Sequence, residues 1–240
     1  MMKKFMVLFI CVLMLLPASP SFAKKKKLRL GVLRFTNTTH AGWWTGTAGT
    51  ELQDMLIAEL AGMKCFSVLE RKELGAVLRE QNLGISGRVS KNTRAKIGNI
   101  TGAKYLVAAT VSAFEKNTSG GGAGLSFKGI SVGGKRKRAY IAVDLKVIDV
   151  DTGEIAEVRT VEATSKSGGL NLGVFRGGFG GTLGGHKKTP TGKAIRACIM
   201  EIAEYLKCSM IKGPNAPCME EYNAKESRRR EKTKGSIDLE

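Results

Sequence analysis

The chain has 240 residues and a formal net charge of +18, with 39 Lys or Arg against 21 Asp or Glu. A cytosolic protein this basic would be expected to bind nucleic acid, but the N-terminal segment excludes that partner because it predicts export from the cytoplasm. The length suits one domain, or one domain with insertions.

The N-terminus has the three parts of a secretory signal peptide. Two lysines at 3–4 precede an apolar run at 5–16, and Ser-Phe-Ala at 21–23 matches a small-x-small cleavage site. The run is too short for a membrane-spanning helix, which needs about 20 residues. Cys11 follows an isoleucine, where a lipid-anchored cysteine requires a small residue. We therefore expect residues 1–23 to be cleaved, and the basic surface to face anionic lipid, lipopolysaccharide or an acidic client chain.

The first half of the mature chain predicts alternating strands and helices. Apolar side chains recur with helical spacing after a polar loop at 36–50, and Thr50 and Gln53 stand at the spacing of a capping box. In the next predicted helix, Val77 and Leu78 are expected to face the core. The predicted elements are a strand at 28–35, a helix from Thr50 to Met63, a strand at 66–69, helices at 70–81 and 91–100, and a strand at 105–114.

The second half predicts an antiparallel pair of strands followed by a helix and a tail. Residues 140–150 alternate apolar and polar side chains, which is the pattern of a half-buried strand. Thr189-Pro190 matches an N-cap followed by proline at the first helical position. We expect the folded part to be one α/β (α+β) domain. This domain spans 24–212 and also contains a tight turn at 151–153, a returning strand at 154–164 and a helix from 189. A basic, disordered tail at 213–240 follows the domain.

Two glycine-rich inserts interrupt this domain, at 115–139 and 165–188. Such inserts usually form flexible, solvated loops, but apolar side chains in both alternate with polar residues or glycine, as in a half-buried strand. A transmembrane strand needs only about 9–11 residues, so each insert has room for a β-hairpin. Because lipid does not tolerate an open sheet edge, such hairpins could span a membrane only within a ring of copies. The residues assigned to them are Leu125, Phe127, Ile130, Leu170, Leu172, Val174 and Phe175.

Four cysteines remain in the mature chain: Cys65, Cys198, Cys208 and Cys218. Export places them in an oxidising compartment, which permits disulfides. Cys198 and Cys208 lie on one predicted helix at a separation of about 15 Å, which is too far for a bond. Cys208 and Cys218 flank a Gly-Pro turn and are the nearest candidates for a bridge, with free, buried thiols as the alternative.

The sequence offers no argument for an enzyme. Only two histidines, His40 and His186, are present, and neither stands at metal-ligand spacing with another ligand. Gly129, Gly134 and Lys135 have the spacing of a phosphate-binding loop. However, an arginine follows where Ser or Thr must hold magnesium, and the next segment predicts a strand instead of a helix. We therefore expect no catalytic residue, no metal site and no cofactor.

Several short motifs together resemble those of the CsgG family, the curli-type secretion channels of the bacterial outer membrane. The resemblance covers nearly all of the mature chain up to about Cys208, and the motifs follow the family's order. They are Phe-Ser-Val-Leu-Glu-Arg at 66–71, Gly-Ala-Lys-Tyr-Leu-Val at 102–107, Gly-Gly at 121–122, Ile-Ala-Val-Asp-Leu at 141–145, Asp-Thr-Gly-Glu-Ile at 151–155 and Gly-Val-Phe-Arg at 173–176.

The resemblance implies a periplasmic α/β domain whose two hairpins close, in a homo-oligomeric ring, into one transmembrane β-barrel surrounded by outer-membrane lipid. It implies the passage of unfolded, amyloid-forming curli-like subunits, and it leaves open whether a periplasmic gating factor exists. The loop after the first strand, here 39–47, would line a constriction with stacked aromatic and polar side chains. Trp44 falls near the family's aromatic ring, and Trp43 stands in place of a polar amide. The family's other aromatic is missing, and Thr39 or His40 stands near its position.

Three features depart from the family pattern. No lipid-anchored N-terminal cysteine is present, four cations occupy 135–138 in the first hairpin, and the second hairpin is short and rich in glycine. Because a lipid-facing cation near the bilayer midplane costs about 2–4 kcal/mol, the four cations must lie at the rim or the tip. The sequence favours a channel of the outer membrane that faces the periplasm. The alternative is a periplasmic scaffold or activator of envelope assembly with the same fold and no pore.

Overall fold

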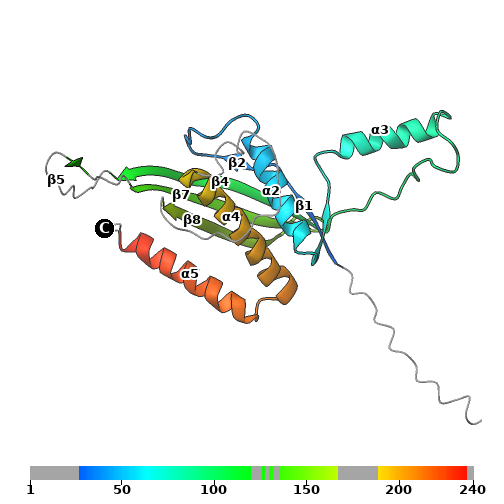
Figure 1. Cartoon of the computed structure of the whole chain (residues 1–240). Coiled ribbons are helices and arrows are strands. Elements are labelled where there is room, and N and C mark those ends of the chain that lie inside the picture. The colour runs from blue at the N-terminus through cyan, green and yellow to red at the C-terminus, as the bar shows by residue number, and fades with distance from the viewer. Residues whose placement is uncertain (1–26, 120–125, 128–129, 132–135, 167–188, 237–240) are drawn as a thin grey trace, which may run out of the picture.

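The computed structural model describes residues 27–119, 126–127, 130–131, 136–166 and 189–236, and these form an α/β domain (Figure 1). The strands are β1 (Leu28–Val32), β2 (Thr36–Asn37), β3 (Phe66–Leu69), β4 (Tyr105–Ser119), β5 (Ser126–Phe127), β6 (Ile130–Ser131), β7 (Arg136–Asp149) and β8 (Ile155–Lys166). The helices are α2 (Ala48–Gly62), α3 (Leu74–Ile85), α4 (Pro190–Leu206) and α5 (Pro217–Lys234), and a π-helical turn, η2 (Lys207–Lys212), follows α4.

The main sheet has a parallel half and an antiparallel half. Its strand order is β3-β1-β4-β7-β8, and β2 also pairs with β4. β3, β1 and β4 run parallel, whereas β7 is antiparallel to both β4 and β8. Helices α2 and α4 pack against each other and against one face of this sheet. We call the other face the open face, because no further helix of the described segments packs extensively on the sheet.

Alternating side chains of the strands build the core beneath α2 and α4. On β7, Ile141, Val143 and Val147 are at most 2% exposed, whereas Lys146 between them is exposed. Burying each such side chain contributes about 1.5–3 kcal/mol. The start of α4 confirms the sequence prediction, since the backbone N–H of Gly192 donates to Thr189 Oγ1 at 3.2 Å. The buried stripe of α4 includes Ile195, Cys198, Ile199, Ile202 and Leu206.

The expected capping box of the first helix is wrong. α2 begins at Ala48, so Thr50 lies inside the helix and cannot cap it. Gln53 is 5% exposed, and its Nε2 donates to the carbonyl oxygen of Val32 at 2.7 Å. That carbonyl is at the end of β1, where the strand leaves the sheet and a buried acceptor needs a partner. Gln53 therefore joins α2 to β1 instead of closing the helix end.

The segment between β3 and β4 differs most from the sequence prediction. We call residues 70–104 the arm, because it projects away from the sheet (Figure 1). Its helix, α3, begins later than expected, and Val77 and Leu78 are 42% and 45% exposed instead of facing the core. The predicted helix at 91–100 is wrong, since these residues form turns and are all exposed. A helix of that length is marginal without extensive packing, and this segment only touches α3, where Arg94 lies against Gly84.

The C-terminal segment is also corrected, because α5 forms where a disordered tail was expected. Tyr222 is 8% exposed and packs edge-on against Tyr205 of α4, with ring centroids 5.3 Å apart. The Arg159 guanidinium of β8 lies over both rings and donates to the Tyr222 carbonyl. Within α5, the hydrogen bond from Arg229 lowers the pKa of Glu226 to about 2. Aromatic packing and local ion pairs thus order a segment that is polar on average.

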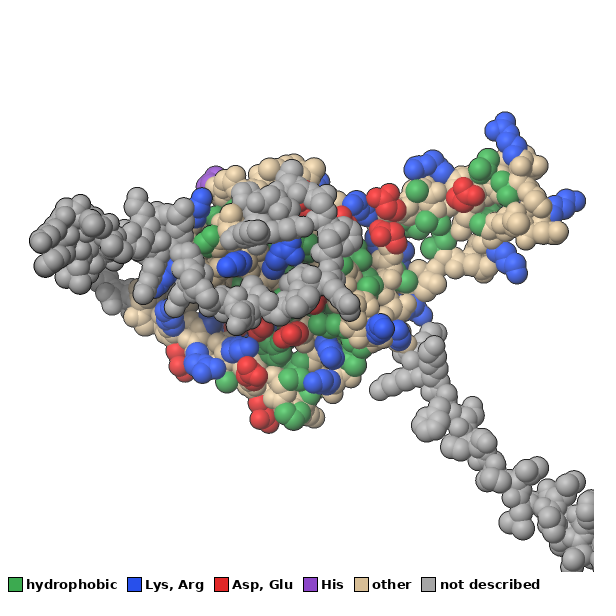
Figure 2. All heavy atoms as spheres, in the orientation of Figure 1, with side chains coloured by type: hydrophobic (Ala, Val, Ile, Leu, Met, Phe, Trp, Pro, Cys, Tyr) green, Lys and Arg blue, Asp and Glu red, His purple; other side chains and the backbone are tan. Residues whose placement is uncertain are grey.

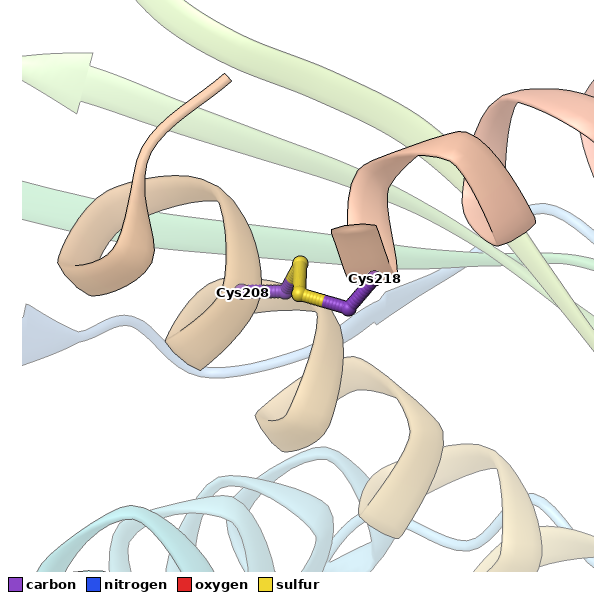
Figure 3. The surroundings of a disulfide bond; sticks show 2 residues. All are labelled: Cys208 and Cys218. Carbon is purple, nitrogen blue, oxygen red and sulfur yellow. A yellow bond between two sulfur atoms is a disulfide. The ribbon is translucent and has the colours of Figure 1, made fainter. Parts of the chain in front are cut away.

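A disulfide fixes the start of α5 to the end of α4. Cys208 lies in η2 and Cys218 in the first turn of α5, with Cα atoms 6.2 Å apart (Figure 3). Cys65 is a half-buried free thiol, and Cys198 is a fully buried one. Burial raises the pKa of the Cys198 thiol, which keeps it protonated and unreactive. The bond therefore forms between the two cysteines that the Gly-Pro turn brings together.

We expect the disulfide to hold α5 in place. Replacing both Cys208 and Cys218 with Ser should lower the free energy of unfolding by about 2–3 kcal/mol, because the bridge closes a short loop. Amide hydrogen exchange in 217–234 should become faster. Cys65→Ser serves as the control, since Cys65 is in no bond, and it should leave both measurements nearly unchanged. Equal exchange rates in the double variant and the native protein would contradict this role.

Candidate functional site

The loop at 38–47 is held at both ends, at its start by β4 and at its far end by Arg34. Thr36 and Asn37 of β2 pair with β4, and the N–H of Thr38 donates to the Val111 carbonyl at 3.1 Å. At the far end, the Arg34 guanidinium donates to the Gly46 carbonyl, and a Cβ on Gly49 would collide with the Phe35 carbonyl. Gly49 is thus required where the helix start meets the end of the first strand. The loop therefore occupies a defined position beside β4.

The two tryptophans of this loop have different environments. Trp43 is 8% exposed, and its ring meets Phe114 of β4 edge-on at a centroid distance of 5.6 Å. Trp44 is only partly buried and contacts the Trp43 ring edge-on at 5.5 Å. Such aromatic pairs contribute about 0.5–1.5 kcal/mol beyond the area they bury. Trp43 therefore anchors the loop within the protomer, and Trp44 is the tryptophan with accessible ring surface.

The two smaller residues predicted for the site lie at the start of the same loop. Thr39 is half-buried, and both its N–H and its hydroxyl donate to Asn37 Oδ1, at 2.9 and 2.7 Å. This turn fixes the backbone just before His40, whose side chain is exposed. The structure thus places all four predicted residues on one ordered loop, with His40 and part of Trp44 facing outward.

A cavity of about 500 Å³ lies where this loop, the strands β4 and β7 and the start of α4 meet. Trp43 and Phe114 provide aromatic walls, and Lys116 and Arg138 provide cations. The Trp43 Nε1–H is buried and has no acceptor among the described residues. The cavity could hold an apolar group that carries an acidic one.

Sequence reasoning missed Lys116 and Arg138 as site residues, although both stand at the ends of the first insert. The remaining lining residues are His40, Ala41, Gly42, Thr189, Pro190 and Thr191.

The first insert continues the main sheet instead of starting a separate unit. The pairing of β4 with β7 runs from the core to Ser119 opposite Arg136, with one β-bulge between Val111 and Ala113. Further out, Phe127 of β5 pairs with Ile130 of β6. The other residues assigned to hairpins lie outside the described residues: Leu125, Leu170, Leu172, Val174 and Phe175.

Of the four cations at 135–138, Arg138 lies where the two long strands leave the core, and Lys135 lies outside the described residues. Arg138 is exposed, while its neighbour Ala139 is 1% exposed. Across the described ranges 27–119, 126–127, 130–131, 136–166 and 189–236, no helix combines the length and the apolar character needed to cross a bilayer. The same ranges contain no cluster of three His, Cys, Asp or Glu side chains that could hold a metal ion.

The burial of Trp43 makes it the structural member of the aromatic pair. Trp43→Ala should lower the free energy of unfolding by about 3–5 kcal/mol, as truncation of a buried aromatic side chain does. Trp44→Ala is the matched control and should cost clearly less, because its ring is only partly buried. Chemical denaturation of both variants measures the difference. Equal losses in the two variants would show that Trp43 is not the anchor.

Known proteins were compared with this chain by sequence and by structure. Residues 16–237 match the family described as "Curli production assembly/transport component CsgG". The proteins of that name from Escherichia coli K12 and Salmonella typhimurium are each 32% identical over 126 residues, covering 51% of this chain and 46% of the relative. The chain thus spans about half the length of these relatives.

The solved structure of hypothetical protein CT253 from Chlamydia trachomatis is similar to this chain with a TM-score of 0.46 and 13% sequence identity. The match covers 76% of this chain and 97% of the CT253 chain. The family match extends over most of the chain, which therefore belongs to the CsgG family of curli production assembly and transport components.

Proposed function

We propose that this chain forms an oligomeric outer-membrane channel through which unfolded curli-like subunits leave the periplasm. The observation that carries the proposal is the long pairing of β4 with β7, which one β-bulge interrupts. It begins in the core, at Tyr105 opposite Asp149, and extends into the first insert, at Ser119 opposite Arg136. A ribbon that continues from a buried core has a fixed direction and a fixed register. It can therefore present the insert to the bilayer in the same orientation in every copy.

The charge distribution along this ribbon suits a membrane rim. Arg138 is exposed next to the buried Ala139, so this cation stands between the packed core and the outer part of the insert. Cations at this level can contact the anionic headgroups of lipid or lipopolysaccharide. The same charges would be costly near the bilayer midplane. The exposed position of Arg138 supports the expectation that these cations lie at the rim of the membrane.

A single copy cannot complete such a channel. In lipid, the backbone groups of a free strand edge would lack hydrogen-bond partners, at a cost of several kcal/mol each. Neighbouring copies must therefore pair their hairpins until the ring closes. The 38–47 loop is attached to β4 on every copy, so a ring of copies would also form a ring of loops around the axis. The family to which the chain belongs supports an assembly and transport role.

The accessible ring of Trp44 suits the narrowest part of this path. The constriction must let an unfolded chain pass without recognising one particular sequence. Aromatic faces suit this task because they contact many kinds of side chain without a specific hydrogen bond. The buried Trp43 would hold the loop, and the partly exposed Trp44 would meet the passing chain. The two adjacent tryptophans would thus have separate roles, in agreement with their different burial.

Replacing Trp44 with Ala should widen the constriction. We expect a higher single-channel conductance in planar bilayers, because each copy in the ring would lose one aromatic ring from the narrowest point. Trp44→Phe is the matched control, since it keeps an aromatic face, and its conductance should stay close to that of the native protein. Channels of unchanged conductance in Trp44→Ala would exclude Trp44 from the constriction. A complete lack of conductance in the native protein would instead overturn the channel and favour a scaffold.

A further inference from the structure

The arm at 70–104 carries apolar side chains that nothing in the described protomer covers. On α3, Val77, Leu78 and Ile85 are 42%, 45% and 59% exposed, and their spacing places them on one side of the helix. The arm extends away from the sheet (Figure 1), and green apolar side chains are visible along it (Figure 2). A stripe of this kind marks an interaction site, because exposed apolar area is otherwise unfavourable in water.

The order of the strands indicates where this stripe belongs. β1 and β3 are parallel neighbours, and α2 connects them on the core face. The next connection returns from β3 across β1 to the parallel strand β4. Crossovers between parallel strands are right-handed in about 98% of cases. Because the two connections run in opposite directions along the sheet, the second must lie on the opposite face from α2. The apolar side of α3 therefore fits the open face.

The open face carries an apolar row that matches this expectation. The register places Leu69, Gly31, Leu106, Ile148 and Ile155 opposite one another across β3, β1, β4, β7 and β8 in turn. Arg71 lies above Gly31 at the end of the row nearest its own arm. At the other end the row is exposed, since Ile155 is 57% exposed and the nearby Val158 is 64% exposed. We call Ile148, Val150, Ile155 and Val158 the β7–β8 patch.

Polar contacts fix both ends of the arm at its own sheet. Lys104 Nζ lies 2.8 Å from carboxylate oxygens of both Asp149 and Asp151, and this pairing lowers the pKa of Asp149. The Arg71 guanidinium donates to the Thr101 carbonyl at 3.3 Å. The arm thus leaves the protomer from a fixed base, with α3 displaced from the face that its topology assigns to it.

The charges of the arm and of the patch are complementary. Between residues 86 and 100 the arm contains four Lys or Arg and no Asp or Glu. The turn at 149–154, which borders the β7–β8 patch, contains three Asp or Glu and no Lys or Arg. Lys104 offsets only part of that negative charge. The surface that would bind the arm is therefore an apolar one with an acidic border. The β7–β8 patch and the turn at 149–154 form such a surface on this chain.

We propose that the apolar side of α3 docks on the β7–β8 patch of a second copy of this chain. The open face of each copy is then covered by α3 of a neighbouring copy, because its own α3 is carried outward by the arm. The contact joins two different surfaces, so repeating it links copies head to tail and closes a ring when the rotation between copies allows it. The inference rests on the ring of the proposed function but does not require that the ring conduct.

A charge placed on the stripe should separate the copies. Leu78→Glu should reduce the detergent-extracted protein from a multi-chain assembly to single chains by native mass spectrometry, while circular dichroism stays unchanged because Leu78 is exposed in the protomer. Ala76→Glu is the matched control. It adds the same charge to the same exposed helix, about 200° away around its axis, and should leave the assembly intact. An assembly of unchanged mass in Leu78→Glu would overturn the proposal.

A photo-crosslinking amino acid at position 85 identifies the surface that α3 meets. We expect two differently tagged copies to become joined, with the crosslink mapped to residues 148–158 of the other chain. Crosslinks within one chain would show that the arm closes on its own sheet and would overturn the proposal. Conductance separates the two hypotheses. Assemblies that crosslink but do not conduct would refute the channel alone, whereas conducting assemblies of Leu78→Glu would refute the arm contact alone.

Discussion

The antiparallel pairing of β4 with β7 is the interaction on which the rest of the structure depends. Its inner half is buried beneath α2 and α4, where Val107 and Val147 face each other with no exposed surface. Its outer half extends past Ala139 into the first insert. β2 joins β4 at Thr36 and Asn37 and thereby fixes the 38–47 loop beside the ribbon. The hydrogen-bonded strands β4 and β7 thus set the positions of the core, the candidate constriction and the insert.

The sheet is covered unevenly, and this shapes how the molecule can associate. Helices α2 and α4 bury one face, while no other helix of the described part of the chain packs extensively on the open face. On the β8 side, Arg159 and the disulfide to η2 hold α5 in place. The helix that topology assigns to the open face is carried outward by the arm. In the proposed arm contact, the β7–β8 patch of one copy would be covered by the exposed apolar side of α3 from another.

Strong local signals allowed much of the fold to be predicted from the sequence. The alternation around Val143, the turn at 151–153 and the Thr189 cap each act over a few residues, and the structure confirms the strands and the helix that they indicate. The errors lie where distant contacts decide. Gln53 serves a carbonyl of β1, and Tyr222 orders α5 through Tyr205 and Arg159. The neighbouring sequence likewise cannot reveal that Trp43 packs on Phe114, so it did not indicate which of the two tryptophans is buried.

The central claim is that copies of this chain close into a ring around a pore, and images of the assembled protein test it most directly. Protein extracted from the outer membrane in detergent can be examined by negative-stain electron microscopy, with its mass measured on the same sample. The account predicts ring-shaped particles of several chains with a stain-filled central hole. Compact particles with the mass of a single chain, or assemblies without a central hole, would contradict it.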